Sequence, residues 1–257
     1  MKTSSFATVA VLAALATAPT LVACTDGDPI EDGTTSDEIS ARPRVDLWKD
    51  GGSFVFALIS ASGETLIDSQ DYANRAAALG GLVSVLDNGT QASRYTIAVD
   101  ANGSARFQLL AANRQVIGTS QTYATRAAAT TALNASIAAV KAYPRHWTTG
   151  SGARFKIAKD AGGKHYFHLH AANGAIVLRS ERYETLGAAL NGAFSVTDNG
   201  ISATRYQMLT AASGGTYFNI VAANGQVIAT SEVYSSSSNA TRARDAISAL
   251  LPSVTIL

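Results

Sequence analysis

The chain has 257 residues, of which 47% are hydrophobic and 15% charged, and its formal net charge is +1. This composition excludes an intrinsically disordered chain, because enough apolar side chains are present to build a core. No internal stretch reaches the roughly 20 apolar residues that span a bilayer. The charge shows no clustered basic stretch, so we expect no nucleic-acid partner.

The N-terminal segment is typical of an export signal. Lys2 provides a positive charge, and residues 6–18 form an apolar run that is too short for a transmembrane helix. Leu21-Val22-Ala23-Cys24 follows and resembles a bacterial lipobox, in which cleavage precedes the cysteine. We therefore predict a lipoprotein signal peptide at residues 1–23. Cys24 would carry diacylglycerol and a further acyl chain such as palmitate, which together give stable membrane anchoring.

The alternative is an ordinary secretory signal that leaves Cys24 unmodified. Cys24 is the only cysteine, which is consistent with an exported protein that has no disulfide framework. Thr25, rather than aspartate, follows it. This arrangement resembles the default outer-membrane sorting of enterobacterial lipoproteins. We expect an outer-membrane location, with the membrane contacted through the anchor at Cys24.

Residues 24–43 form an acidic segment that we expect to be a flexible tether. It holds six acidic residues before its first basic residue, Arg42. Because Lys2 is the only basic residue before Arg42, residues 42–257 carry a net charge of +6. A charge of this size favours solubility and loose contact with anionic partners.

The rest of the chain contains four copies of one motif, in which a serine precedes a tyrosine by three residues. The tyrosines are 51, 60 and 51 residues apart, and a fixed period of this size indicates repeated supersecondary units. The motif residues are Ser69, Tyr72, Ser120, Tyr123, Ser180, Tyr183, Ser231 and Tyr234. We expect them to form the repeat scaffold, since one active site would not need four versions of itself.

Each copy begins with three short stretches that alternate as β-strands do. In the second stretch a phenylalanine precedes leucine or isoleucine by two residues, as in Phe167 and Leu169, so both lie on one face that we expect to be buried. Asn173-Gly174 and Asn224-Gly225 predict type I′ turns between the second and third stretches. Arg114 replaces the glycine in copy two, where a left-handed backbone would cost about 1–2 kcal/mol, so that turn can differ in type.

A helix is predicted after each third strand. Asn74, Thr125 and Thr185 stand two residues beyond a tyrosine and can cap the first helical turn. In the fourth copy the apolar stripe starts two residues later, which predicts an insertion and a cap at Ser238. The repeat unit is therefore β-β-β-α.

The four units are predicted to form two tandem pairs. Asp87-Asn88-Gly89 recurs as Asp198-Asn199-Gly200 after 111 residues, and the longest connection separates copies two and three. We expect an α+β fold with antiparallel sheets and helices packed on one face. The predicted boundaries are 44–142 for the first pair, 143–152 for the linker and 153–251 for the second pair.

The pattern from Phe218 to Tyr234, Phe-x-Leu-x-Ala-Ala-Asn-Gly-x-x-Ile-x-x-Ser-Glu-x-Tyr in its general form, resembles the repeat of the YegP-like family of uncharacterised bacterial proteins. The resemblance covers roughly residues 44–251. Copy one departs from it, with Ser60-Ala61-Ser62 in place of Ala-Ala-Asn. The resemblance implies a compact α+β unit for each repeat. It implies no reaction and no catalytic residue.

Chemistry is expected where one copy departs from the others, and residues 164–170 hold three of the four histidines. His168 and His170 would lie on one strand face about 7 Å apart, a spacing that suits a metal if a third ligand is present. No carboxylate or cysteine stands at a matching spacing nearby. The alternative is that His168 occupies an exposed position, as Gln108 and Asn219 do.

Arg145, His146 and Trp147 in the linker are a second candidate, as a binding surface for a sugar or a peptide. Alternatively, Trp147 fills the gap between the pairs. We expect an envelope lipoprotein that serves as a binding or structural module and contacts a protein, peptide or glycan, without a cofactor and without catalysis. The alternatives are a metal-assisted hydrolase that uses His168 and His170, and a stress-related structural component of the envelope.

Overall fold

The computed structural model describes residues 42–145, 147–148 and 152–257. The predicted signal peptide, Cys24 and the tether up to residue 41 lie outside the described residues, as does His146. In the described part of the chain, no helix is both long enough and apolar enough to cross a membrane.

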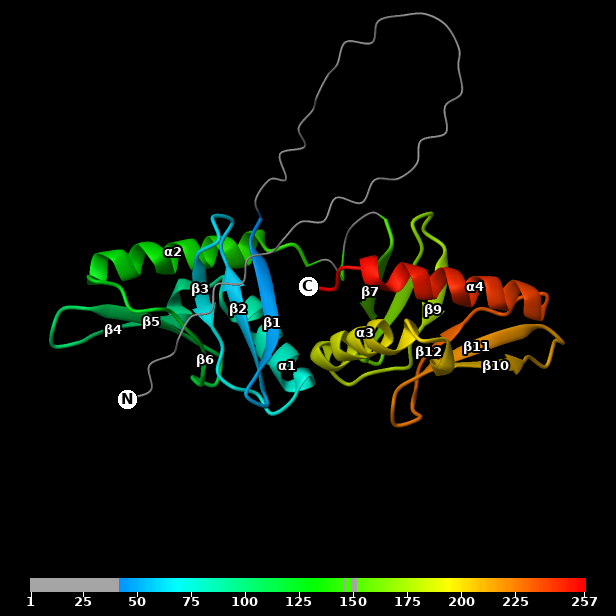
Figure 1. Ribbon diagram of the computed structural model, residues 1–257. Coiled ribbons are helices and arrows are strands. Elements are labelled where there is room, and N and C mark those ends of the chain that lie inside the picture. Colours follow the sequence, from blue (N-terminus) through cyan, green and yellow to red (C-terminus); the bar gives the residue numbers. More distant parts are fainter. Residues whose placement is uncertain (1–41, 146, 149–151) are drawn as a thin grey trace, which may run out of the picture. The chain divides into compact units, whose positions relative to one another are not determined.

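Each repeat folds as three antiparallel strands followed by one helix (Figure 1). The first two repeats comprise β1 (Arg44–Asp50), β2 (Ser53–Ile59), β3 (Thr65–Asp68), α1 (Arg75–Asn88), β4 (Tyr95–Val99), β5 (Ala105–Leu110), β6 (Val116–Thr119) and α2 (Arg126–Ala142). The last two comprise β7 (Arg154–Lys159), β8 (His165–His170), β9 (Ile176–Arg179), α3 (Leu186–Gly200), β10 (Tyr206–Thr210), β11 (Thr216–Val221), β12 (Val227–Ser231) and α4 (Ser237–Leu250).

Two repeats join to make each six-stranded sheet. The strand order is β1-β2-β3-β6-β5-β4 in the first sheet and β10-β11-β12-β9-β8-β7 in the second. The third strands of two repeats therefore pair at the centre of each sheet, where Asp68 faces Thr119 and Arg179 faces Thr230. All these pairs are antiparallel, so the predicted α+β fold is confirmed.

The core lies between the helices and one face of each sheet. The four phenylalanines of the second strands are fully buried, and so are the leucine or isoleucine residues that follow them: Phe56, Leu58, Phe107, Leu109, Phe167, Leu169, Phe218 and Ile220. The helix α1 contacts β2 of its own repeat and also β5 and β6 of the next, and α2 contacts β5, β4 and β3. The helices α1, α2 and α3 thus each pack against both repeats of their sheet, and the apolar face predicted from the alternation is confirmed.

The position of each helix cap is set by its distance from the tyrosine and not by the start of the apolar stripe. Asn74, Thr125 and Thr185 each accept a hydrogen bond from a backbone N–H in the first turn, as predicted. In the fourth repeat the cap is Ser236, which accepts from the Asn239 N–H, and not Ser238. Ser236 stands two residues beyond Tyr234, as the other caps stand beyond their tyrosines. The strand-to-helix geometry therefore fixes the start of the helix.

The turns between second and third strands are not type I′. Gly174 has a φ of 85°, but Asn173 has no positive φ. The Gly174 N–H donates to the Ala171 carbonyl, and the sheet register shifts between Leu169 and His170. This arrangement is a turn that closes on a left-handed residue beside a β-bulge. Arg114 occupies the equivalent place with a φ of 65°, so copy two keeps the turn despite lacking the glycine.

The helices α1 and α3 contact each other and so connect the first pair of repeats to the second. Arg75 donates to Asn191 Oδ1 (3.0 Å), pairs with Asp198 (2.8 Å) and lies 4.9 Å from the centre of the Phe194 ring. Gly187 lies so near α1 that a Cβ there would come within 2.8 Å of the Gly80 nitrogen. Both helices belong to one compact unit, residues 39–257.

Candidate functional site: the open face of the second sheet

The repeated serines are committed to backbone hydrogen bonds. In each repeat, Oγ accepts from the N–H of the second-strand phenylalanine at 2.8 or 2.9 Å and donates to the carbonyl of the next residue. The serine thus satisfies two backbone groups where the chain leaves the third strand. The four serines are Ser69, Ser120, Ser180 and Ser231.

The repeated tyrosines also serve the fold. Tyr72, Tyr183 and Tyr234 stack on the phenylalanine of their own repeat, with ring centres 6.1 Å apart. Each of the four, Tyr123 included, forms a β-bridge with the first residues of the second strand. Burial raises the pKa of Tyr183 to about 12, because the phenolate would lose its hydration. These contacts support a scaffold role rather than a catalytic one.

His168 and His170 lie on the sheet face that points away from the helices. They alternate with Phe167 and Leu169, which are fully buried, whereas both histidines are half-buried. Their ring centres are 6.3 Å apart, and His170 Nδ1 lies 3.0 Å from the Gly174 carbonyl oxygen. His165 points to the other face, as its alternation with Phe167 predicts.

Strand pairing places two cations beside His168 that the local sequence did not reveal. Lys156 on β7 and Arg179 on β9 are its direct neighbours in the sheet. Burial lowers the pKa of His168, and the charges of Arg179, His170, Arg182 and Lys156 lower it further. Lys156 and Arg179 lie 12 and 11 residues from His168 in the chain, so only the registers of both hairpins could have identified them.

This environment disfavours a metal cation at His168 and His170. A positive field opposes a divalent ion, and a neighbouring carboxylate is what such a site would need to offset it. Across residues 42–145, 147–148 and 152–257, no group of three or more His, Cys, Asp or Glu side chains is placed to hold a metal. The metal-assisted hydrolase therefore gains no support from the described geometry.

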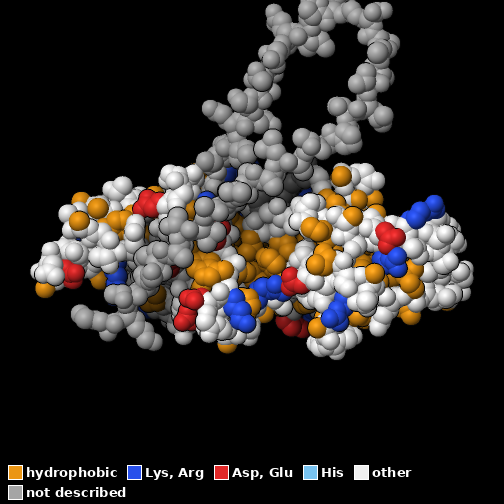
Figure 2. Space-filling view, viewed as in Figure 1, with side chains coloured by type: hydrophobic (Ala, Val, Ile, Leu, Met, Phe, Trp, Pro, Cys, Tyr) orange, Lys and Arg blue, Asp and Glu red, His pale blue; other side chains and the backbone are white. Residues whose placement is uncertain are grey.

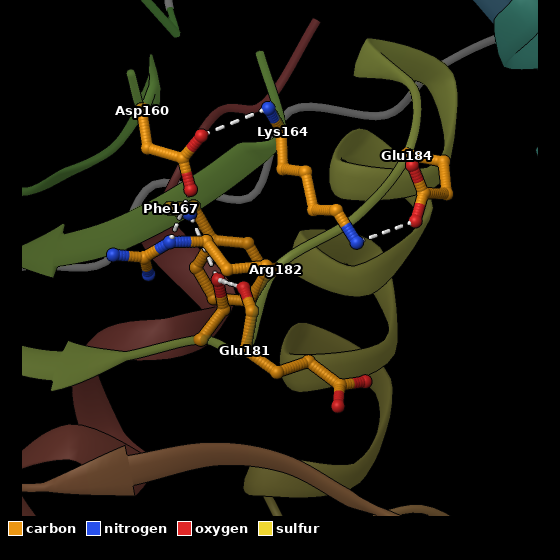
Figure 3. A network of polar contacts seen from close by, with 7 residues as sticks. Asp160, Lys164, Phe167, Glu181, Arg182 and Glu184 are labelled. Carbon is orange, nitrogen blue, oxygen red and sulfur yellow. Dashed lines mark hydrogen bonds and ion pairs between the residues drawn. The ribbon is translucent and has the colours of Figure 1, made fainter. Parts of the chain in front are cut away.

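A network of ion pairs borders the open face at the start of β8 (Figure 3). Arg182 donates to Asp160 (2.9 Å) and lies 4.1 Å from the centre of the Tyr166 ring. The Lys164 N–H also donates to Asp160, and this bond helps to hold the pKa of that carboxyl below its usual range. The Lys164 ammonium pairs with Glu184 (2.8 Å). Arg182 is thus neutralised by a partner, whereas Lys156 and Arg179 form no ion pair with any residue that the structure describes.

Trp147 and Arg145 of the linker both make contacts within the fold. Trp147 is only 2% exposed and packs beside Tyr143, so its ring is not available to a ligand. Arg145 donates to the Leu86 carbonyl (3.1 Å) and lies 3.6 Å from Asp87. Trp147 therefore fills a gap in the packing, which is the alternative that the sequence left open.

An open hollow of about 840 Å³ lies elsewhere on the molecule. Its lining includes Leu47, Phe194, Ile201 and Ile256, and neither His168 nor His170 lines it. It therefore does not join the histidines to a carboxylate. On the face shown in Figure 2, basic and acidic side chains are interspersed among apolar and neutral ones, without a broad patch of one charge.

The four repeats match a known family. The family described as "Domain of unknown function (DUF1508)" matches residues 50–95, 100–142, 160–207 and 211–255, which is more than half of the chain. The chain belongs to the DUF1508 family. Its relatives carry the name UPF0339, and the one of Bordetella pertussis is 44% identical over 89 residues, covering 35% of this chain and 77% of the relative. The UPF0339 protein YegP of Escherichia coli O157:H7 is 43% identical over 89 residues, with the same coverage.

Solved structures of the DUF1508 relatives include the solution structure of YegP from Escherichia coli, described as a protein of unknown function. It is 32% identical, covers 42% of this chain and 92% of its own, and has a TM-score of 0.39. The resemblance to the YegP-like family is confirmed. Because the family is described as having no known function, the site must be interpreted from this chain's own residues.

Proposed function

We propose that this protein is a non-catalytic binding module of the bacterial envelope, anchored through a lipid at Cys24. The observation that carries the proposal is that the two faces of each sheet differ in which residues they hold. The residues common to all repeats form the turns, caps and core, whereas the face away from the helices holds the residues that differ between repeats. A binding surface needs such variable, accessible positions on a rigid support.

Site-specific photo-cross-linking on intact cells tests the binding function. A photoreactive residue at Asn219 would report on the open face of the second sheet, where Asn219 is half-buried and hydrogen-bonded to Thr230. Lys141, exposed on α2, provides the matched control position. We expect Asn219 to capture one recurring protein, peptide or glycan that Lys141 does not capture. Equal capture from both positions, or none, would contradict the proposal.

Metabolic labelling with palmitate tests the anchor. We expect the wild-type protein to incorporate the label and to fractionate with the outer membrane. The Cys24→Ser protein should lose both properties because its thiol is absent, whereas Thr25→Ser should keep them. Labelling of Cys24→Ser would show that the lipid is carried elsewhere, and soluble wild-type protein would remove the anchor altogether.

A further inference from the structure

The open faces of the two sheets differ in charge at equivalent places. Strand pairing puts Lys156, His168 and Arg179 in one row across the third repeat. The first repeat has Asp46, Ala57 and Asp68 in the same row. The second and fourth repeats have neutral polar side chains there: Thr96, Gln108, Thr119, Gln207, Asn219 and Thr230. Only the third repeat is cationic in this row.

The row forms part of a compact cluster. Neighbouring strands lie about 4.8 Å apart, so Lys156, His168 and Arg179 follow one another at that spacing. His170 lies two residues further along β8 and faces Arg154 on β7. With His170 Nδ1 3.0 Å from the Gly174 carbonyl oxygen, its Nε2 is left to contact a ligand. This area thus contains four neighbouring basic or titratable side chains, Arg154 and Lys156 on β7 and His168 and His170 on β8. Arg179 on β9 is a fifth.

No carboxylate balances this cluster among the residues that the structure describes. Neither Lys156 nor Arg179 forms an ion pair there, and both are exposed. Arg182, whose charge also lowers the pKa of His168, is paired with Asp160. Mutual repulsion among Lys156, Arg179 and protonated histidines would be relieved by a bound anion. The depressed pKa of His168 has the same origin, after burial.

The surroundings limit the size of the anion. Along the row, the positions that follow Arg179 are neutral, namely Thr230, Asn219 and Gln207. Along the strands, Asp160 lies in the loop that connects β7 to β8, at the end of these strands away from His170. An extended polyanion, such as a nucleic acid strand or a membrane surface, would run onto neutral or acidic neighbours. A small ligand with several charges fits within the basic area.

We propose that the cluster of Lys156, His168, His170 and Arg179 binds a compact ligand that carries phosphate groups, such as a phosphorylated sugar terminus. A phosphate group offers three strong acceptor oxygens and carries up to two negative charges, so it can bridge basic side chains on adjacent strands. This inference rests on the proposed binding function and names the ligand class of its open face.

Calorimetric titration of the full chain with inorganic tripolyphosphate tests the cluster. We expect binding to weaken by about tenfold or more in Lys156→Ala/Arg179→Ala, a loss that corresponds to about 1.4 kcal/mol or more of binding free energy. The control Arg126→Ala/Lys141→Ala removes the same charge from exposed positions on α2 and should bind as the wild type does. Equal weakening in both variants would overturn the proposal, because it would show only a net-charge effect.

Three further measurements sharpen the test. Binding should tighten as the pH falls below about 6.5, because burial and the neighbouring charges lower the pKa of His168 and it gains its proton there, and His168→Gln should lose that dependence. Citrate, a tricarboxylate, should bind clearly more weakly than tripolyphosphate, and equal affinity would overturn the phosphate class.

Preferential binding to phosphatidylglycerol vesicles, or self-association that tripolyphosphate does not displace, would also overturn it. A partner captured at Asn219 regardless of the Lys156 and Arg179 substitutions would leave the binding function standing without this ligand.

Discussion

At the level of single residues, Ser231 shows how much of the repeat motif serves the fold. Its Oγ accepts from the Phe218 N–H (2.9 Å) and donates to the Glu232 carbonyl (2.7 Å), and the side chain is 6% exposed. Ser231→Ala leaves a buried backbone N–H without its partner. We expect a loss of about 1–3 kcal/mol in the free energy of unfolding, measured by urea denaturation.

Ser213→Ala is the matched control for this prediction, because Ser213 is exposed in a turn of the same repeat. Its unfolding free energy should stay within about 0.5 kcal/mol of the wild type. If Ser231→Ala were no less stable than Ser213→Ala, the hydrogen bonds of the repeated serine would not be structural.

Tyr206 makes stability depend on alkaline pH. Burial raises its pKa to about 12, and its hydroxyl donates to the Gly200 carbonyl (2.6 Å). Unfolded tyrosine titrates near about 10, so the folded state holds its proton longer. The contribution of Tyr206 to the free energy of unfolding is therefore fully present below about pH 10. It is lost as pH rises through about 12, by roughly 1.4 kcal/mol per pH unit.

Denaturation at stepped alkaline pH, with tyrosinate absorbance as a second probe, measures this effect. Tyr206→Phe should make the decline between about pH 10 and 12 shallower, while Tyr183, whose pKa is also raised to about 12, still contributes to it. Tyr217→Phe, on the opposite face of the neighbouring strand, should leave it as in the wild type. An unchanged decline in Tyr206→Phe would exclude this tyrosine as its source.

At the level of elements, two adjacent glycines in α1 are expected to behave in opposite ways. A Cβ at Gly80 would meet open space, whereas a Cβ at Gly81 would collide with the Tyr72 ring and hydroxyl. Gly80→Ala should stabilise the protein by up to about 1 kcal/mol, because alanine restricts the unfolded chain and favours helix. Gly81→Ala should destabilise it, because Tyr72 must leave its stack on Phe56.

Thermal and urea unfolding of the two variants side by side provides the measurement, and each serves as the control of the other. Both substitutions add one methyl group to neighbouring positions of one helix. Stabilisation by both would mean that Tyr72 does not need its place on Phe56.

Most elements could be predicted from the sequence because their signals are local. Alternation identified the Phe167 and Leu169 face, and a side-chain oxygen two residues after each of the first three tyrosines identified their caps. The turn at Asn173-Gly174 was assigned wrongly, because the same dipeptide also suits a turn with only its glycine left-handed. The fourth cap was misplaced at Ser238, since four consecutive serines offer equivalent caps and only tertiary geometry selects Ser236.

At the level of the whole molecule, Arg75 connects the two sheets through α1 and α3. It contacts Asn191, Asp198 and Phe194 at once, and its side chain is 23% exposed. Arg75→Ala removes a hydrogen bond, an ion pair and a ring contact. We expect a loss of about 1–2 kcal/mol, discounted for the exposure of Asp198.

Arg126 begins α2 as Arg75 begins α1 and is exposed, which makes Arg126→Ala the matched control. That variant should change the unfolding free energy by less than about 0.5 kcal/mol. Equal effects of the two substitutions, by calorimetry, would show that the position in the helix matters and the contact with α3 does not.

Only part of the candidate site could be identified from the sequence. His168 and His170 stood out as a departure from the other repeats, but their basic neighbours come from β7 and β9. Finding Lys156 and Arg179 required the register of two hairpins, one of which carries a bulge. The sequence allowed both a surface position and a place in the packing for Trp147, because burial of an aromatic ring in a linker depends on the packing of distant segments.

The pairing of equivalent strands at the centre of each sheet has a further consequence. Where β3 meets β6, or β9 meets β12, each repeat completes a sheet with a near-copy of itself. The same strand edge is offered by any other molecule of this protein. Refolding at high concentration should therefore yield interlocked dimers in which one repeat has exchanged partners, and dilution before refolding should favour the monomer.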